Sequence, residues 1–342
     1  MNIRKALGLL IQGRSLSEAD AETVMEEIMA GQATPAQIGG FLIVLRLKGE
    51  TVEEVTGFAR TMRRNAVTIH SDRQLLVDTC GTGGDGCGTF NISTTAAFVI
   101  AGAGLAVAKH GNRSVSSKCG SADVLEALEV HLNLLPEDVG ACIDEVGMGF
   151  LYAPQLHPAM KHTIGPRREM GVRTVFNILG PLTNPAGAQV QVLGVYDAAL
   201  TEVMAQVLDS LGSQSAFVVH GAQGLDELST VGPNRVTQLR NGQVHTFSLD
   251  PLELGLPRAT LPDLKGGEAD ENAAIVRDIL AGELGPRRDV VLLNAACGLL
   301  AGGLAADLAD GLSLAAHSID SGAAQAKLTE LVAFTQRRSS NP

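Results

Sequence analysis

The chain has 342 residues, of which 45% are hydrophobic and only 3% aromatic, so it is long enough for one large α/β unit or for two unequal domains with an aliphatic core. A formal net charge of −11 argues against nucleic-acid or membrane partners. The five cysteines lack C-x-x-C spacing, which supports neither a disulfide framework nor a zinc site and favours a reducing, cytoplasmic location.

The first 70 residues are predicted to form helices only. The apolar stretch 6–11 is too short and too quickly followed by polar residues for a secretory signal, so we interpret it as an amphipathic helix. Further along, a hydroxyl residue is followed three positions later by Glu or Gln, the spacing of a helical capping box. These pairs are Ser15 with Glu18, Thr34 with Gln37, and Thr51 with Glu54.

From residue 75 onwards, short apolar runs alternate with helical stretches, which is typical of a mostly parallel sheet covered on both faces. A hairpin is indicated at Asn241-Gly242. We expect an α/β protein with a large sheet domain, flanking helices and a smaller all-helical domain. Strands are predicted at 75–77, 105–108, 190–195, 217–219, 235–238 and 244–247, and helices at 94–103, 121–128, 200–211 and within 270–337.

The first segment with chemical character is the glycine-rich run 78–85, directly after a predicted strand. Its glycines let backbone N–H groups converge on an anion, and the next helix presents its free N–H groups close by. It matches neither the Walker A loop nor the dinucleotide fingerprint. The run therefore indicates a phosphate site, with an ordinary glycine-rich turn as the alternative.

A second segment, 109–117, follows the next predicted strand. Lys109 offers a positive charge for a polyphosphate, and Ser116 and Ser117 offer hydroxyl donors. Because loops at the carboxyl ends of adjacent parallel strands meet in one crevice, this segment and the glycine-rich run are expected to face each other. The alternative is a solvated loop of slightly basic character.

Two further segments carry charged groups suited to a substrate. Asp226 and Glu227 follow a predicted strand and suit Mg²⁺, a hard cation that takes few carboxylates; the alternative is an exposed acidic turn. Arg167 and Arg168 lie downstream of the proline-rich stretch 152–158 and suit a carboxylate. Surface arginines without a ligand are the alternative for this pair.

Taken in order, these segments resemble the anthranilate phosphoribosyltransferase family over essentially the full length of the chain. Departures from the family pattern at Cys119, Glu129 and Cys297 are mild and touch no expected ligand. The matching segments are 78–85, 91–94, 109–117, 120–126, 150–161, 173–185, 219–221 and 224–230.

The resemblance implies a fold of the nucleoside phosphorylase–phosphoribosyltransferase type. The helical domain would comprise residues 1–70 and an insertion at roughly 133–190, and the α/β domain residues 71–132 and 191–342. It also implies a homodimer formed through the helical domain. The reaction would be a pentosyl transfer from 5-phosphoribosyl-1-pyrophosphate (PRPP) to anthranilate, giving N-(5-phosphoribosyl)anthranilate and pyrophosphate in tryptophan biosynthesis. A pyrimidine nucleoside phosphorylase and a paralogue with another acceptor are the alternatives.

The resemblance also implies the residues of the site. Anthranilate would contact Gly81, Asn112 and Arg167, and Mg²⁺ would be served by Ser93, Asp226 and Glu227. No residue must act as a strong general base; His110 is a candidate proton acceptor, with a structural role as the alternative. PRPP would be held by Gly81, Gly83, Gly84, Asp85, Thr89, Asn91, Ile92, Ser93, Thr94, Lys109, His110, Gly111, Asn112, Arg113, Ser114, Val115, Ser116, Ser117 and Ser121.

Overall fold

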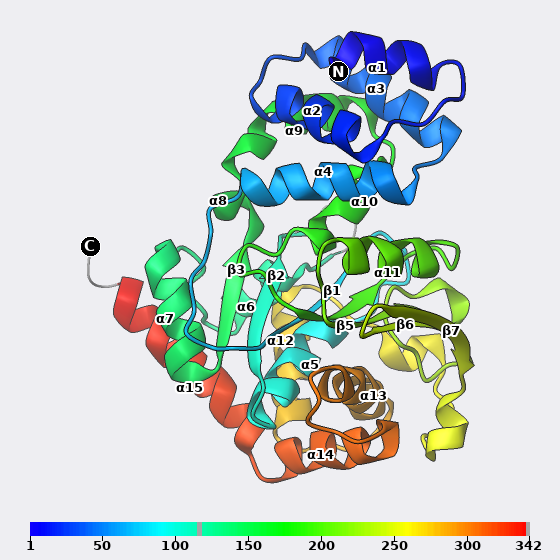
Figure 1. Ribbon diagram of the computed structural model, residues 1–342. Helices are drawn as coiled ribbons and strands as arrows, with labels where there is room; N and C mark the ends of the chain where they lie inside the picture. Colours follow the sequence, from blue (N-terminus) through cyan, green and yellow to red (C-terminus); the bar gives the residue numbers. More distant parts are fainter. Residues whose placement is uncertain (115–117, 340–342) are drawn as a thin grey trace.

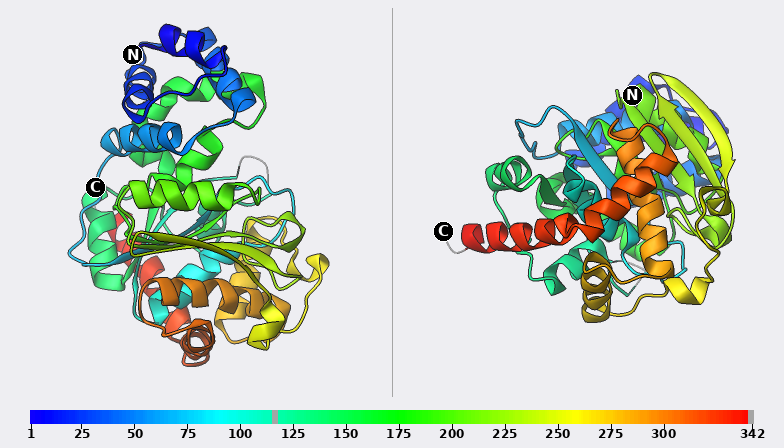
Figure 2. Two further views of the ribbon diagram at one scale, coloured as in Figure 1. Left: turned by 45° about the vertical axis from the view of Figure 1, so that its right-hand side comes forward. Right: turned by 90° about the horizontal axis from the view of Figure 1, so that it is seen from below.

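The computed structural model describes residues 1–114 and 118–339, and it consists of a small helical domain above a larger α/β domain (Figure 1; Figure 2, left). The helical domain combines the N-terminal helices with helices from the middle of the chain, because α9 packs on α2 and α3 and α10 contacts α4. Its helices are α1 (Ile3–Leu10), α2 (Glu18–Met29), α3 (Pro35–Lys48), α4 (Val52–Arg64), α8 (Ala153–Leu156), α9 (Lys161–Met170) and α10 (Phe176–Leu179).

Helices α3 and α4 begin at the predicted capping boxes, Thr34 with Gln37 and Thr51 with Glu54. The prediction for α2 is wrong, because its N-cap is Ser17, whose hydroxyl accepts a hydrogen bond from the N–H of Asp20. Ser15 lies outside the helix. Both Ser15 and Ser17 precede acidic residues at workable spacing, so the local pattern did not distinguish them.

Glu54 joins the helices of this domain from a fully buried position. Its Oε1 accepts the N–H of Leu16 at 2.9 Å, which fixes the segment leading into α2. Its Oε2 accepts the N–H of Thr51 at 2.9 Å and Nζ of Lys48 at 2.8 Å. One carboxylate therefore caps α4 and links it to α3 and to the start of α2.

The α/β domain is built on a seven-stranded sheet with the order β3-β2-β1-β4-β5-β6-β7. The first five strands of this order are parallel, and β6 and β7 form the predicted antiparallel hairpin. The strands are β1 (Leu76–Gly81), β2 (Ala106–Gly111), β3 (Met148–Tyr152), β4 (Val190–Gly194), β5 (Ser215–His220), β6 (Asn234–Arg240) and β7 (Gln243–Leu249).

Strand β3 was not predicted, and it lies inside the segment 133–190 that the resemblance assigned to the helical insertion. The strand has only five residues and follows α7 after the single residue Gly147, so it offers too short an apolar run to distinguish from a continuing helix. The helices that pack on the N-terminal helices, α9 and α10, follow β3 and begin at residue 161.

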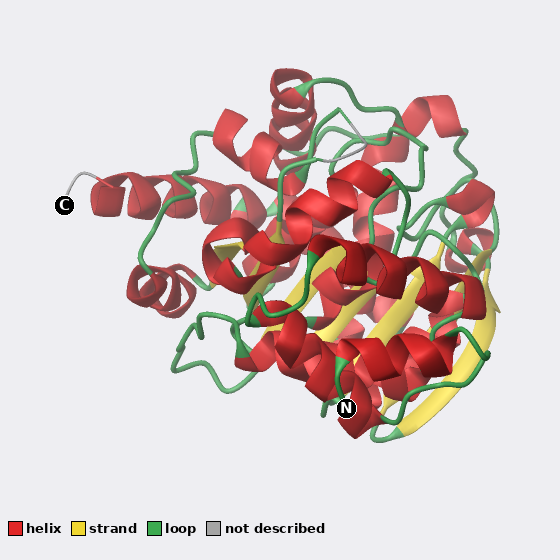
Figure 3. Ribbon diagram, turned by 90° about the horizontal axis from the view of Figure 1, so that it is seen from above, coloured by secondary structure: helices red, strands yellow, loops and turns green. Residues whose placement is uncertain are grey.

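Helices cover both faces of the sheet (Figure 3). On one face α5 and α13 contact β1 and β4, and on the other α11 contacts β5 and β6 and also reaches α4. The apolar cluster of the helical domain continues into the sheet through Leu193 and Val218, so this one cluster includes residues of both domains. The remaining helices are α5 (Ile92–Gly102), α6 (Ser121–Ala127), α7 (Pro136–Val146), α11 (Leu200–Ser210), α12 (Ala269–Leu280), α13 (Pro286–Ala301), α14 (Leu308–Asp320) and α15 (Ala323–Ser339).

None of the helices in the described ranges has both the length and the apolar character needed to cross a membrane. The described part of the chain also has five short 3₁₀ turns: Pro158–Met160, Gly180–Leu182, Ala222–Gly224, Pro251–Leu254 and Leu261–Leu264.

The network around Glu54 makes a stability prediction. Glu54→Ala should lower the free energy of unfolding by about 3 kcal/mol, because it leaves two backbone N–H groups without their acceptor and removes the carboxylate that pairs with Lys48. Glu54→Gln keeps one acceptor oxygen and should lower the free energy of unfolding by less. Urea denaturation measures both, with Glu53→Ala as the exposed control in the same helical turn. A loss no larger in Glu54→Ala than in Glu53→Ala would contradict the assigned role.

Candidate active site

The glycine-rich turn after β1 is in direct contact with Asp226. The N–H of Gly83 donates to Oδ2 of Asp226 at 2.6 Å. A Cβ atom at Gly81 would lie 2.4 Å from that oxygen, and one at Gly194, at the end of β4, would lie 1.6 Å from the carbonyl oxygen of Asp226. Both positions therefore require glycine so that the segment carrying Asp226 can approach the ends of β1 and β4.

Glu227 lies against the N-terminus of α5. The N–H of Ser93 donates to Oε1 of Glu227 at 3.1 Å. The structure thus brings together Ser93, Asp226 and Glu227, the three residues predicted to serve a metal ion. It places them beside the first turn of α5, whose N–H groups and positive dipole end favour anions.

The carboxyl groups of this pair are surrounded by protein and lack sufficient positive charge nearby. Burial, together with the charges of Glu227 and Asp85, raises the pKa of Asp226 well above its usual range. Burial also raises the pKa of Glu227, although Lys109 and Ser93 oppose the shift. Oδ2 of Asp85 is buried and has no hydrogen-bond partner. A cation bound here would lower the pKa of Asp226 and of Glu227 and would give the Asp85 oxygen a partner.

These oxygens fit Mg²⁺ in particular. Mg²⁺ prefers oxygen ligands and is usually bound through one or two carboxylates together with water and substrate phosphates. Within residues 1–114 and 118–339, no cluster of three or more His, Cys, Asp or Glu side chains is arranged to hold a metal ion alone. The site therefore suits an ion that arrives with, or is completed by, a phosphorylated substrate.

Lys109 does not lie on a loop as predicted. It belongs to β2 together with His110 and Gly111, and its side chain is 1% exposed. Its Nζ donates to the carbonyl oxygen of Thr79, in the strand that leads to the glycine-rich turn. Burial lowers the pKa of Lys109, and the charges of Asp78 and Glu227 oppose this shift. Lys109 thus lies beneath the site, where its charge offsets those of the carboxylates.

Asp78 connects β1 to its surroundings below the turn and was not assigned to the site from the sequence. Its carboxylate accepts the N–H of His110 at 3.1 Å and the side-chain amide of Asn184 at 2.9 Å. Burial raises the pKa of Asp78 to about 6, against the effect of Lys109. Asp78 lies inside the strand, before the glycines. Apart from its place in the matched motif, nothing in the sequence there indicated a role in the site.

His110 is buried beside a second histidine. Nε2 of His110 lies 3.2 Å from Nε2 of His157, the residue that follows α8. Burial and the neighbouring His157 lower the pKa of His110 to about 3, although the carbonyl of Gly180 opposes the shift. Burial also lowers the pKa of His157 to about 4. Both rings are therefore neutral near pH 7, and neither is tuned to take up a proton.

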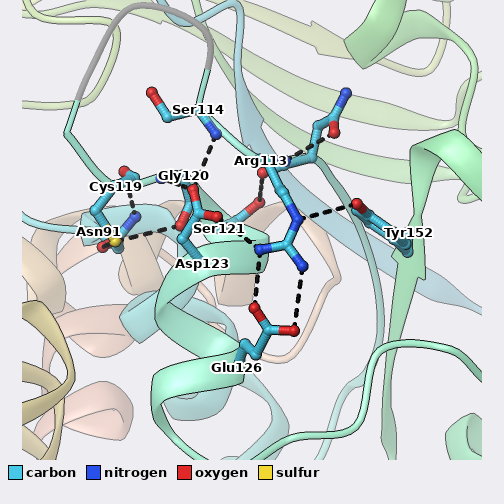
Figure 4. A network of polar contacts seen from close by, with 10 residues as sticks. Asn91, Arg113, Ser114, Cys119, Gly120, Ser121, Asp123, Glu126 and Tyr152 are labelled. Atoms are coloured by element: carbon cyan, nitrogen blue, oxygen red, sulfur yellow. Dashed lines mark hydrogen bonds and ion pairs between the residues drawn. The ribbon is translucent and has the colours of Figure 1, made fainter. Parts of the chain in front are cut away.

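The segment after β2 is held by α6 (Figure 4). Asp123 accepts the N–H groups of Ser114 at 3.0 Å and Gly120 at 2.8 Å. The guanidinium of Arg113 donates to Asp123, to both carboxylate oxygens of Glu126 and to the hydroxyl of Tyr152. The Arg113 side chain is thus engaged by protein, and the predicted residues Val115, Ser116 and Ser117 lie outside the described ranges.

Most of the other residues predicted to hold PRPP have contacts within the α/β domain. Asn112 is exposed, and its carbonyl oxygen accepts the hydroxyl of Ser121 at 3.3 Å. The side chain of Asn91 is held by the carbonyl of Cys119 and by Asn272. Thr89 forms an isolated bridge with Lys265, while Ile92 and Thr94 are buried in the first turn of α5.

Arg167 lies on α9, in the helical domain, and is half-buried. Its guanidinium carbon is 5.1 Å from the ring centroid of Phe176, and burial lowers its pKa. No ion pair formed by the described residues includes Arg167. A desolvated arginine without a carboxylate partner is suited to bind one from a ligand. Arg168, next to it, is exposed.

Comparison with known proteins gives consistent results over the whole chain. Two family models match, one described as the glycosyl transferase family, a/b domain, over residues 73–325, and one as the glycosyl transferase family, helical bundle domain, over residues 4–66. The anthranilate phosphoribosyltransferase of Moorella thermoacetica is 59% identical over 334 residues, 98% of each chain. That of Pelotomaculum thermopropionicum is 60% identical over 97% of this chain and 96% of its own.

Solved structures agree. The crystal structure of anthranilate phosphoribosyltransferase from Thermus thermophilus matches with a TM-score of 0.92 and 48% identity over 97% of this chain and 99% of that one. The Saccharomyces cerevisiae enzyme in complex with PRPP and Mg matches with a TM-score of 0.90 and 28% identity over 98% of both chains. This chain belongs to the anthranilate phosphoribosyltransferase family.

Proposed function

We propose that the protein transfers the phosphoribosyl group of PRPP to anthranilate, giving N-(5-phosphoribosyl)anthranilate and pyrophosphate in tryptophan biosynthesis. The observation that carries this function is the meeting of the glycine-rich turn, the N-terminus of α5 and the Asp226–Glu227 pair, through the contacts of Gly83 with Asp226 and Ser93 with Glu227. Backbone N–H groups beside two carboxylates form a site for a phosphorylated ligand that binds with a cation.

The pyrophosphate end of PRPP is assigned to this meeting point. The yeast relative is in complex with PRPP and Mg, and here Ser93, Asp226 and Glu227 would hold the ion. When bound, Mg²⁺ neutralises the phosphate oxygens of PRPP and of the departing pyrophosphate. The backbone of the turn aligns the ribose for displacement at its C1 atom, so the contribution of the chain is mainly positional and electrostatic.

The anthranilate end is assigned to Arg167, with Asn112 and Gly81. A yeast relative is in complex with 4-fluoroanthranilate, an aromatic amine that carries a carboxylate. Arg167 lies on α9 and forms no ion pair with a carboxylate among residues 1–114 and 118–339, which supports a contact with the anthranilate carboxylate. That contact would direct the amine towards the ribose. The anilinium formed on attack is acidic enough to lose its proton without a strong base, in accord with the low pKa of His110.

The transferase is favoured over a pyrimidine nucleoside phosphorylase by the buried acidic pair. The charge of Glu227 already raises the pKa of Asp226, so a phosphate bound without a cation would be repelled by the pair. The free guanidinium of Arg167 likewise favours an acceptor with a carboxylate over another acceptor.

The protein is also proposed to be cytoplasmic and to form a homodimer through its helical domain. Ile11, at the end of α1, is 71% exposed, and Leu47, on α3, is 81% exposed. Two large aliphatic side chains exposed on this small domain support a contact that covers them.

The acidic pair and the overall reaction are tested together. The fluorescence of anthranilate should fall only when PRPP and Mg²⁺ are both present. Asp226→Asn combined with Glu227→Gln should remove most of kcat and the response to Mg²⁺, because the carboxylates that hold the ion are lost. A wild-type protein that consumes no anthranilate would refute the function, and an unchanged Mg²⁺ titration in the double variant would refute the metal assignment.

The acceptor assignment predicts a selective effect at Arg167. Arg167→Ala should raise the KM for anthranilate roughly tenfold or more and leave the KM for PRPP nearly unchanged, since one charged hydrogen-bonding partner of the carboxylate is removed. Arg168→Ala, its exposed neighbour, serves as the control. Steady-state kinetics with each substrate varied in turn measures both constants, and equal damage to the two would show that Arg167 does not clamp anthranilate.

The histidine pair predicts a pH dependence of stability. The pKa values of His110 and His157 are lowered from 6.5, so the unfolded chain binds more protons below that pH. The contribution of the two neutral histidines to the free energy of unfolding is fully present above about pH 6.5. It is lost as the pH falls towards 4, and the loss at pH 5 is on the order of 2 kcal/mol for each histidine. Urea titrations at pH 7 and 5 measure this loss. It should shrink in His110→Gln with His157→Gln and persist in the exposed control His245→Gln; an equal loss in all three proteins would exclude the pair as its source.

A further inference from the structure

Arg173 connects the glycine-rich turn to the helical domain. It lies between α9 and α10, yet its guanidinium extends to the α/β domain, where Nη2 donates to the carbonyl oxygen of Gly84. Gly84 has φ of +75°, and a Cβ atom there would lie 3.3 Å from Nη2 of Arg173. The guanidinium therefore lies directly over the turn, and a side chain at Gly84 would crowd it.

A second contact orients the guanidinium. Its Cζ atom lies 4.3 Å from the ring centroid of Tyr196, a distance at which a cation is attracted to the face of an aromatic ring. The N–H of Tyr196 donates to Oγ1 of Thr82 at 3.1 Å, so this ring is itself attached to the glycine-rich turn. Arg173 is thus held in two ways by residues that follow β1 and β4.

The backbone of Arg173 is bonded to α3 of the helical domain. Nη1 of Arg46, on α3, donates to the carbonyl oxygen of Arg173. Helix α9, which leads to Arg173, packs on α3. A continuous line of contacts therefore runs from α3 through Arg173 to Gly84.

The turn is fixed from two sides by different domains. Asp226 of the α/β domain accepts the N–H of Gly83, and Arg173 of the helical domain donates to the carbonyl of Gly84. These two contacts hold the peptide units on either side of the Gly83–Gly84 peptide, which restricts rotation of the turn between them. No carboxylate among the described residues forms an ion pair with Arg173, so its charge also remains available beside the expected pyrophosphate.

We propose that Arg173 is a positioning residue for PRPP, which fixes the shape of the glycine-rich turn and links that shape to the position of the helical domain. The inference rests on the proposed phosphoribosyl transfer. It is separate from the anthranilate contact assigned to Arg167, because Arg173 acts on the pyrophosphate end of the site.

The test compares Arg173→Ala and Arg173→Lys with the wild type and with Arg240→Ala, an exposed arginine at the end of β6. Arg173→Ala should raise the KM for PRPP roughly tenfold or more and leave the KM for anthranilate within about twofold. Arg173→Lys keeps a donor but lacks the planar stacking group, so its KM for PRPP should lie between those of the wild type and Arg173→Ala. Low concentrations of guanidinium chloride should partly restore Arg173→Ala and have no effect on the wild type or on Arg240→Ala.

Calorimetric titration of the full-length proteins with PRPP and Mg²⁺ separates this inference from the proposed function. A weaker affinity in Arg173→Ala with an unchanged melting temperature supports the positioning role even if no transfer is detected. A wild type that binds PRPP but does not consume anthranilate would refute the function alone. Unchanged PRPP affinity in Arg173→Ala, or equal losses for both substrates with a lowered melting temperature, would overturn the inference.

Discussion

The structure of the site depends on one close contact, in which the Asp226 carboxylate accepts the N–H of Gly83 in the glycine-rich turn. Placing Asp226 and Glu227 side by side in partly desolvated positions is unfavourable, as the raised pKa values of both show. The fold tolerates this because glycine at positions 81 and 194 lets the chain approach, and because Lys109 lies beneath with its charge buried. A cation held by this pair, as proposed above, would offset the remaining negative charge and allow the site to bind a polyphosphate.

In the proposed reaction, the two domains supply different residues of the site. The carboxyl ends of β1, β4 and β5 meet at one edge of the sheet and present the turn and the acidic pair. The helical domain presents Arg167 and Arg173 from the segments around α9. Because one apolar cluster includes residues of both domains, the proposed acceptor and pyrophosphate sites would be held at a set separation. Such alignment of two substrates is the main contribution expected of an enzyme for this displacement.

The sequence predicted the parts of this arrangement that depend on local chemistry. The glycine run, the capping boxes at Thr34 and Thr51, the Asn241-Gly242 hairpin and the acidic pair each have a short-range cause. It failed where the outcome depends on the tertiary context. Strand β3 is too short to show its periodicity, and Lys109 was expected on a loop because nothing local reveals that the strand continues through it. The link from Arg46 through Arg173 to Gly84 joins residues far apart in the chain, so only the fold reveals it.

The central claim is that the acidic pair and the glycine-rich turn form one binding unit with a cation. Isothermal titration of the wild-type protein with PRPP, repeated over a range of Mg²⁺ concentrations and in excess EDTA, tests it most directly. The account predicts that PRPP affinity rises with Mg²⁺ and is nearly lost in EDTA, because the bare carboxylates repel the pyrophosphate. Equal affinity with and without the ion would contradict it.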